Sequence, residues 1–302
     1  MSDSLVQLGP IPRPRLPEWA RKPRTHFESL HRLKSDLRRL HLHTVCESAR
    51  CPNIHECFSR SAATFMILGN RCTRGCGFCS VPKGNPARHD MRLDPAESAN
   101  VARMAEAMNL RYVVITSVNR DDLPDGGSQH FAETVRAVRR ALPEARVEVL
   151  TPDFCGDLQA IERVLAAGPH VFNHNVETVP RLYRRVRPQA DYRQSLHVLA
   201  FAHGRGVLTK SGFMVGLGET ESEVHALLSD LRAAGTDIAT IGQYLQPTRR
   251  NLPVAAYIEP RQFERYREYG LSLGFQMVFS GPLVRSSYMA DAVHEQARRT
   301  PC

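Results

Sequence analysis

The sequence predicts an α/β protein, an incomplete TIM barrel of the (β/α)6 type with an extension at each end. Three observations support this fold. Short apolar runs alternate with helical patterns from residue 62 to residue 280, and such alternation forms right-handed βαβ units around a parallel sheet. Six or seven such units suit an open barrel better than a closed barrel of eight. The 302 residues, 42% of them hydrophobic, are enough to bury the core.

Each element is placed by the spacing of its apolar residues, which recur at every second position in strands and every third or fourth in helices. The expected strands cover residues 62–68, 112–118, 147–151, 171–177, 209–217, 238–245 and 276–280. The expected helices cover residues 95–108, 129–141, 157–167, 191–204, 220–234 and 260–273, and a basic helix precedes them at 27–42. We therefore expect an N-terminal extension at 1–60, the barrel at 61–284 and a C-terminal tail at 285–302.

Six of the eight cysteines fall within 34 positions and form two triplets. The triplets are Cys46-x4-Cys51-x5-Cys57 and Cys72-x3-Cys76-x2-Cys79. Thiolates are soft ligands suited to iron–sulfur clusters or zinc, and each triplet supplies three of the four ligands that a [4Fe-4S] cube takes. Zinc sites usually add a second C-x2-C pair or two histidines at a defined spacing, which this sequence lacks. Disulfides belong mainly to small secreted domains, so we expect two clusters, each one cysteine short.

The second triplet begins four residues after the first expected barrel strand. It therefore lies on a loop at the C-terminal ends of the strands, where barrels of this kind bind ligands. Three thiolates leave one iron open to a substrate or cofactor. Cys155 and Cys302 belong to neither triplet, and we expect a small buried thiol and a tail residue, respectively.

The formal net charge of +9 is compatible with nucleic acid, an anionic membrane or an acidic protein as partner. The runs Arg184-Arg185-x-Arg187 and Arg249-Arg250 are candidates for docking an acidic protein domain, although such runs usually form a solvated surface. The sequence has no apolar run of membrane-spanning length and no secretory signal pattern. We expect a cytoplasmic protein, because the proline-rich start argues against a transit helix.

The segment Arg71-Cys-Thr-Arg-Gly-Cys-Gly-Phe-Cys79 resembles the C-x3-C-x-aromatic-C motif of the radical S-adenosylmethionine (SAM) superfamily. This resemblance implies that SAM binds the open iron of the cluster on Cys72, Cys76 and Cys79, with Phe78 among the cofactor-binding residues. It also implies that one electron from the reduced cluster splits SAM into methionine and a 5′-deoxyadenosyl radical. The protein then positions the reactants and excludes water.

The segment Cys46-Glu-Ser-Ala-Arg-Cys-Pro-Asn-Ile-His-Glu-Cys57 looks like the auxiliary-cluster motif of the lipoyl synthase family. Further similar segments lie at 116–127, 173–178, 214–219, 243–250 and 281–288, so the resemblance covers about residues 25 to 292. It implies that Ser286 ligates the fourth iron of the auxiliary cluster, with Ser287 as the second choice. From the residues alone, both serines would simply hydrogen-bond a turn.

The resemblance also implies the reaction and the partners. Sulfur from the auxiliary cluster replaces a hydrogen at C6 and at C8 of an octanoyl chain bound to a lysine, and two SAM molecules are used. Implied partners are octanoylated lipoyl-carrier domains, of the glycine-cleavage carrier protein or of 2-oxoacid dehydrogenase acyltransferases. A reductase or ferredoxin-type electron donor and iron–sulfur cluster assembly or carrier proteins are implied as well, but no nucleic acid or membrane.

Polar residues after the strands are candidates for contacts with SAM. On the expected strand at 171–177, alternation puts Asn173, Asn175 and Glu177 on one face. Gly216 and Gly218 permit close approach of a ligand to the backbone, though a tight turn explains them as well. Two other functions stay open: a radical SAM methylthiotransferase acting on tRNA, and a non-catalytic zinc protein that binds RNA. About eight irons per chain, from two cubes, would exclude the zinc protein.

Overall fold

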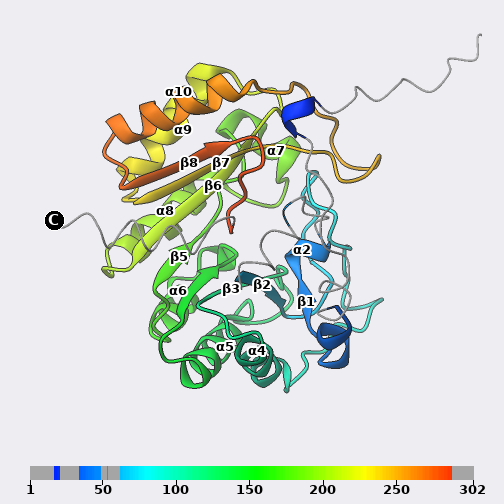
Figure 1. The fold of residues 1–302 in the computed structure, drawn as a ribbon. Coiled ribbons are helices and arrows are strands. Elements are labelled where there is room, and N and C mark those ends of the chain that lie inside the picture. The colour runs from blue at the N-terminus through cyan, green and yellow to red at the C-terminus, as the bar shows by residue number, and fades with distance from the viewer. Residues whose placement is uncertain (1–16, 21–33, 49–52, 54–61, 288–302) are drawn as a thin grey trace, which may run out of the picture.

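The computed structural model describes residues 17–20, 34–48, 53 and 62–287. Its eight strands form one sheet in the order β1 to β8, and β2 to β8 are all parallel to their neighbours. The sheet curves around an interior, and the longer helices lie outside it (Figure 1). This arrangement confirms the expected α/β partial barrel.

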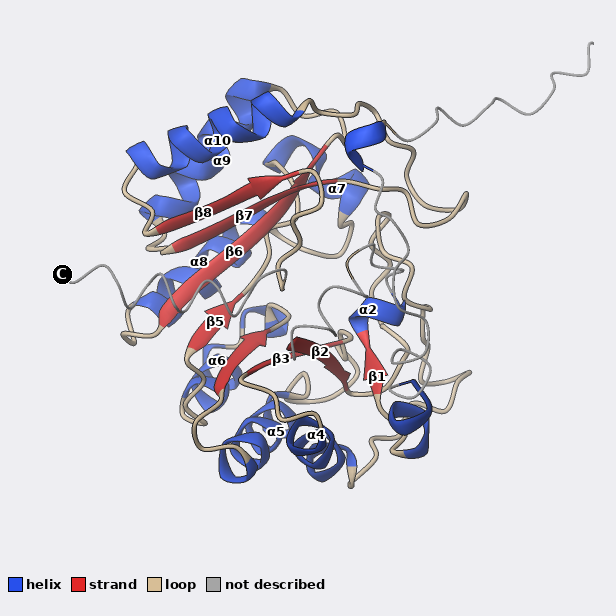
Figure 2. Cartoon of the chain, in the orientation of Figure 1, coloured by secondary structure: helices blue, strands red, loops and turns tan. Residues whose placement is uncertain are grey.

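Except for the end of β5, the parallel strands begin and end close to their expected positions. They are β2 (Ala62–Ile67), β3 (Tyr112–Ser117), β4 (Arg146–Leu150), β5 (Val171–Asn173), β6 (Leu208–Val215), β7 (Ile238–Gln243) and β8 (Met277–Gly281). The outer helices are α4 (Glu97–Ala107), α5 (Ser128–Ala141), α6 (Leu158–Leu165), α8 (Tyr192–His203), α9 (Glu221–Ala233) and α10 (Pro260–Ser272), which cover the outer face of the sheet (Figure 2).

Short elements complete the described chain, and the sequence patterns did not predict them. They are η1 (Glu18–Ala20), β1 (His43–Thr44), α2 (Val45–Ser48), η2 (Phe154–Gly156), η3 (Pro180–Leu182) and α7 (Tyr183–Val186). Of the expected N-terminal helix, residues 34–39 are helical and 27–33 lie outside the described residues. The strand β1 pairs antiparallel with β2, so the extension is attached to one edge of the barrel.

The strand expected at 171–177 ends at Asn173, four residues early. The backbone turns at Glu177, whose φ of +65° lies in the left-handed region that side chains rarely adopt. The Thr178 amide donates a hydrogen bond of 2.8 Å to the carbonyl of Val176, two residues earlier, and this bond closes the turn. Pairing with β6 does not end at Asn173, because Glu177 forms an isolated parallel bridge with Phe213.

Alternation along the strands separates an apolar outer face from a polar interior. Val147 and Val149 pack outward with the helices in one hydrophobic cluster, so Glu148 between them faces the interior. Its carboxylate accepts from Lys210 Nζ at 3.1 Å, from Tyr112 Oη at 2.7 Å and from Asn173 Nδ2 at 2.9 Å. Glu148 and Lys210 are both completely buried, and this network fills the barrel interior beneath the mouth.

Candidate functional site

The second cysteine triplet lies on the loop that follows β2, here called the cluster loop and defined as residues 69–84. The loop closes on itself, because Cys72 N donates to Pro82 O at 2.9 Å and Gly84 N donates to Cys72 O at 2.8 Å. Thr73 N donates to Asn119 O at 3.0 Å, which ties the loop to the end of the neighbouring strand β3. The loop is therefore fixed at the C-terminal ends of the strands, as the sequence predicted.

The three thiols of this loop suit an iron–sulfur cluster. Burial raises the pKa of Cys72 and of Cys76, and it raises the pKa of Cys79 to about 12; all three are close enough to interact electrostatically. The amide of Asn119 donates to Cys72 Sγ at 3.3 Å and that of Val81 to Cys79 Sγ at 3.5 Å. Such donors stabilise a thiolate, and metal binding displaces its proton. The donor set therefore fits a cluster bound to three cysteines.

A buried arginine that the sequence analysis overlooked anchors the cluster loop. Arg74, between Cys72 and Cys76 in sequence, forks onto Asp121 at 2.7 and 2.9 Å and onto Asp153 at 2.7 and 2.8 Å. Burial tends to raise the pKa of Asp153, but the bonds from Arg74 prevail and lower it to about 2. Since the two aspartates follow β3 and β4, Arg74 binds the loop to both strands.

The described residues of the first-triplet segment, 46–48 and 53, contact the cluster loop and the segment after β8. Cys46 is buried on α2, and Ser80 Oγ donates to Ser48 O, at the end of that helix, at 2.5 Å. Asn53, which stands between the other two cysteines in sequence, donates from Nδ2 to Leu283 O at 2.7 Å. The segment of the first triplet therefore touches both the cluster loop and the segment after β8. Cys51 and Cys57 lie outside the described residues, as does Cys302.

Ser286 lies within the barrel mouth, on the segment after β8. Its Oγ accepts from Asn175 Nδ2 at 2.6 Å, and the same amide donates to Glu177 Oε1 at 3.0 Å. The oxygen of the same side-chain amide, Asn175 Oδ1, is buried and has no partner within the described residues. Buried polar atoms are normally paired, so this oxygen fits a polar ligand such as SAM.

Two interior glycines make room for the segment that carries Ser286. A Cβ on Gly242 would lie 2.2 Å from Val284 O, and one on Gly212 would lie 3.2 Å from Ser286 Oγ. Figure 1 shows this segment, coloured red, turning from β8 into the barrel. The absence of side chains on β6 and β7 at these points lets the segment enter the mouth.

Glu177 and Arg187 form a half-buried charged pair of residues beside Asn175. Burial raises the pKa of Glu177, while the Arg187 guanidinium nearby acts in the opposite direction. Arg187 Nη1 donates to Asn175 O at 2.8 Å, so Arg187 points inward, unlike the exposed Arg184 and Arg185 of the same run. A cation placed beside Glu177 would stabilise its carboxylate.

The remaining residues expected to bind SAM are Phe78, Gly216 and Gly218. Phe78 packs with the hydrophobic cluster between the sheet and α9 and α10. Gly216 and Gly218 have φ of +96° and +112°, and a Cβ on Gly216 would lie 2.2 Å from Gln243 Nε2, so the turn itself requires glycine there. The expectation of a buried Cys155 is wrong: it is exposed, because it stands at φ +53° on the turn after β4.

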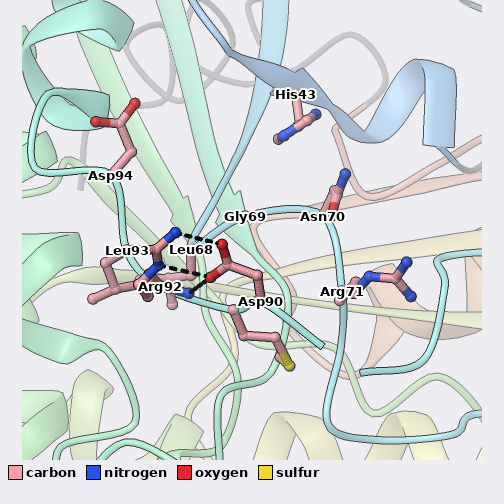
Figure 3. Close-up of a pocket in the computed structure, with 10 residues that line it drawn as sticks. His43, Leu68, Gly69, Asn70, Arg71, Asp90, Arg92, Leu93 and Asp94 are labelled. Carbon is pink, nitrogen blue, oxygen red and sulfur yellow. Dashed lines mark hydrogen bonds and ion pairs between the residues drawn. The ribbon is translucent and has the colours of Figure 1, made fainter. Parts of the chain in front are cut away.

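A cavity of about 420 Å³ lies beside the cluster loop, between its first residues and β1 (Figure 3). It is lined by His43, Leu68, Gly69, Asn70, Arg71, Asp90, Met91, Arg92, Leu93 and Asp94.

Within the described residues no three His, Cys, Asp or Glu side chains could hold a single metal ion. None of the helices in the described ranges is long and apolar enough to cross a membrane.

The chain is similar in sequence to proteins of one family. Residues 66–231 match the model of the radical SAM superfamily, and residues 3–51 match that of the N-terminal domain of lipoyl synthase of the same family. The chain is 56% identical to the lipoyl synthase of Rubrobacter xylanophilus over 94% of its length and 88% of the relative's. It is 54% identical to that of Caldanaerobacter subterraneus, covering 94% and 99%, and 52% identical to that of Thermus thermophilus, covering 97% and 91%.

Solved structures resemble the fold at much lower identity. Methylornithine synthase superposes with a TM-score of 0.55 at 16% identity, over 91% of this chain and 88% of that one. The FeFe-hydrogenase maturase from Carboxydothermus hydrogenoformans gives a TM-score of 0.51 at 14% identity, over 90% and 79%. At this identity the likeness supports the partial barrel alone.

Proposed function

Because the chain belongs to the lipoyl synthase family of the radical SAM superfamily, we propose that its two cysteine triplets hold two [4Fe-4S] clusters with different fourth sites. The enzyme inserts sulfur at C6 and C8 of an octanoyl chain on a carrier-protein lysine, with SAM and two clusters as cofactors. When bound, the cluster on the second triplet supplies the electron that cleaves SAM, and the cluster on the first triplet supplies the sulfur.

We assign Cys72, Cys76 and Cys79 to the radical cluster, whose fourth site stays open for SAM. The ligands of the auxiliary cluster are Cys46, Cys51, Cys57 and Ser286. The hydrogen bond from Asn53 Nδ2 to Leu283 O supports this assignment most directly. It joins the first triplet to the segment before Ser286 across 230 positions of sequence.

Each protein group around the mouth has a defined task in this proposal. Asn175 orients the Ser286 hydroxyl through its 2.6 Å hydrogen bond and offers its unpaired Oδ1 to SAM. Glu177 faces the cationic end of SAM, which compensates a carboxylate that is otherwise costly to bury. Phe78, Gly216 and Gly218 are further proposed contacts of SAM.

The carrier chemistry and the cellular setting follow the same reasoning. The substrate is an octanoylated glycine-cleavage carrier protein or a 2-oxoacid dehydrogenase acyltransferase domain. A reductase or ferredoxin-type protein donates electrons, and cluster assembly or carrier proteins rebuild the auxiliary cluster. We also propose a cytoplasmic location, because thiolate ligands need a compartment that keeps cysteines reduced. The relatives named above do not favour the tRNA methylthiotransferase or the zinc protein.

Anaerobic reconstitution tests the function. Protein with both clusters should hold about eight irons per chain. With SAM, a reductant and an octanoyl-lysine peptide, it should release 5′-deoxyadenosine and form thiolated peptide. Release of 5′-deoxyadenosine with no thiolated peptide would contradict the function.

Two neighbouring serines allow a matched test of the fourth ligand. Ser286→Ala should retain SAM cleavage and lose sulfur insertion, because the auxiliary cluster loses its closing ligand. Ser287→Ala is the control and should behave like the unmodified protein. If the two variants exchange these phenotypes, Ser287 is the ligand. The Mössbauer spectrum distinguishes a cube with four protein ligands from one with an open iron.

A further inference from the structure

Four exposed arginines stand at the barrel mouth, two on a short helix and two on a loop. Arg184 and Arg185 lie on α7, after β5, and Arg249 and Arg250 lie on the loop that follows β7. All four are exposed to solvent. We call these four residues the arginine collar.

Contacts with Gly77 on the cluster loop bring the two halves of the collar together. Gly77 N donates at 2.8 Å to the carbonyl of Val186, next to the first arginine pair. The amide of Leu252, two positions after the second pair, donates to Gly77 O at 3.0 Å. A Cβ on Gly77 would also lie 2.9 Å from the Leu252 side chain. The collar is therefore built around the loop that carries the radical-cluster cysteines.

The collar arginines have no carboxylate partner within the described residues, whereas Arg74, Arg120 and Arg181 each have one. By contrast, Asp121 and Asp153 both pair with Arg74, and Asp122 pairs with Arg120. The chain thus neutralises the carboxylates on one side of the mouth and leaves cations unpaired on the other.

A fifth cation extends the same surface. Lys83 is exposed, and a Cβ on Gly75 would lie 2.6 Å from Lys83 Nζ. Its ammonium group therefore lies against the cluster loop two positions from Gly77. Lys83 therefore adds a fifth positive charge, on the cluster loop itself.

We propose that the arginine collar docks an acidic face of the carrier domain whose lysine bears the octanoyl chain. This inference rests on the proposed function, which supplies a protein-borne substrate. Charge of one sign around a cleft raises association rates by about 10- to 1,000-fold, and arginine binds carboxylates through paired hydrogen bonds. A domain docked there holds its modified lysine beside the cluster loop.

Matched charge reversals test this proposal in the protein carrying both clusters. The collar variants are Arg184→Glu/Arg185→Glu and Arg249→Glu/Arg250→Glu, and the control is Arg136→Glu/Arg140→Glu. The control pair is exposed and lies in the last turns of α5. Helices between parallel strands run opposite to them, so this pair sits at the rim away from the mouth.

Each collar variant should weaken binding of a non-octanoylated carrier domain, and raise KM for the octanoylated domain, by about tenfold. The dependence of kcat/KM on salt should become flatter, because fewer charges steer the encounter. KM for a short neutral octanoyl-lysine peptide should not change, and the control variant should match the unmodified protein with both substrates.

Several results would overturn the docking surface without touching the function. One is carrier affinity in the collar variants equal to that of the unmodified protein, and another is an equal loss in the control variant. A third is that the collar variants lose affinity for single-stranded RNA and keep it for the carrier domain. Failure of the unmodified protein to thiolate the octanoyl peptide would instead contradict the proposed function.

Discussion

Replacing Gly242 by alanine should slow sulfur insertion strongly and leave SAM cleavage intact. Gly242 lies on the inner face of β7, where the segment that carries Ser286 passes closest to the sheet. A Cβ at this position would lie 2.2 Å from Val284 O, whereas ordinary contacts begin at 3.4 Å. The neighbouring atom belongs to the backbone, so it cannot give way by rotating a side chain.

The displacement sets the expected magnitude. Val284 must move by about 1 Å to restore an ordinary contact, and Ser286, two residues on, moves with it. A misplacement of about 1 Å in a catalytic group can reduce the rate about 100-fold. The formation of thiolated peptide should fall by this factor in Gly242→Ala, whereas 5′-deoxyadenosine should form at the unmodified rate, because the cluster loop is untouched.

The neighbouring strand provides a matched control. Gly281 of β8 pairs in register with Gly242, but a Cβ there would meet Val284 Cγ2 at 3.4 Å, which is an ordinary contact. Gly281→Ala should therefore thiolate the peptide normally. If Gly242→Ala forms thiolated peptide at the unmodified rate, the course of the segment does not determine the position of Ser286, and the reasoning fails.

Two further predictions concern buried charges. Arg74→Ala leaves Asp153 buried without its partner, at a cost of about 3 to 5 kcal/mol. This variant should abolish SAM cleavage, because the cluster loop loses its anchor. Normal 5′-deoxyadenosine formation would contradict the anchoring role. Glu148→Gln leaves Lys210 charged inside the barrel and should lower the free energy of urea unfolding by a similar amount, about 3 to 5 kcal/mol. The double variant Glu148→Gln/Lys210→Met should lose less than Glu148→Gln alone, and an equal or larger loss would exclude the pairing as the cause.

Periodicity was enough to predict the barrel strands because each has an outer face that must be apolar. β3 begins at Tyr112 and β7 at Ile238, where apolar runs begin in the sequence. The strand at 171–177 was predicted too long because its regular pairing stops at Asn173 and returns only as one bridge at Glu177, an interruption that residue alternation does not reveal. The strand β1 is only two residues long, too short for a period to appear.

The site depends on contacts between residues distant in sequence, and these were harder to predict. Arg74 stands in the cysteine motif, but nothing in the sequence indicates that its partners are Asp121 and Asp153. Arg187 belongs to a run of arginines whose pattern predicts a solvated surface, yet its guanidinium points inward and donates to the carbonyl of Asn175. A single charged residue within an otherwise uncharged strand, such as Lys210, was the one sequence feature that could have predicted a buried ion pair.

The products formed by Cys46→Ala test most directly the claim that the two cysteine triplets have different tasks. With SAM, reductant and octanoyl-lysine peptide, this variant should release 5′-deoxyadenosine and form no thiolated peptide. Cys72→Ala should form neither product, and Cys155→Ala, which changes a cysteine outside both triplets, should form both. Thiolated peptide from Cys46→Ala would contradict the claim that the first triplet holds the sulfur donor.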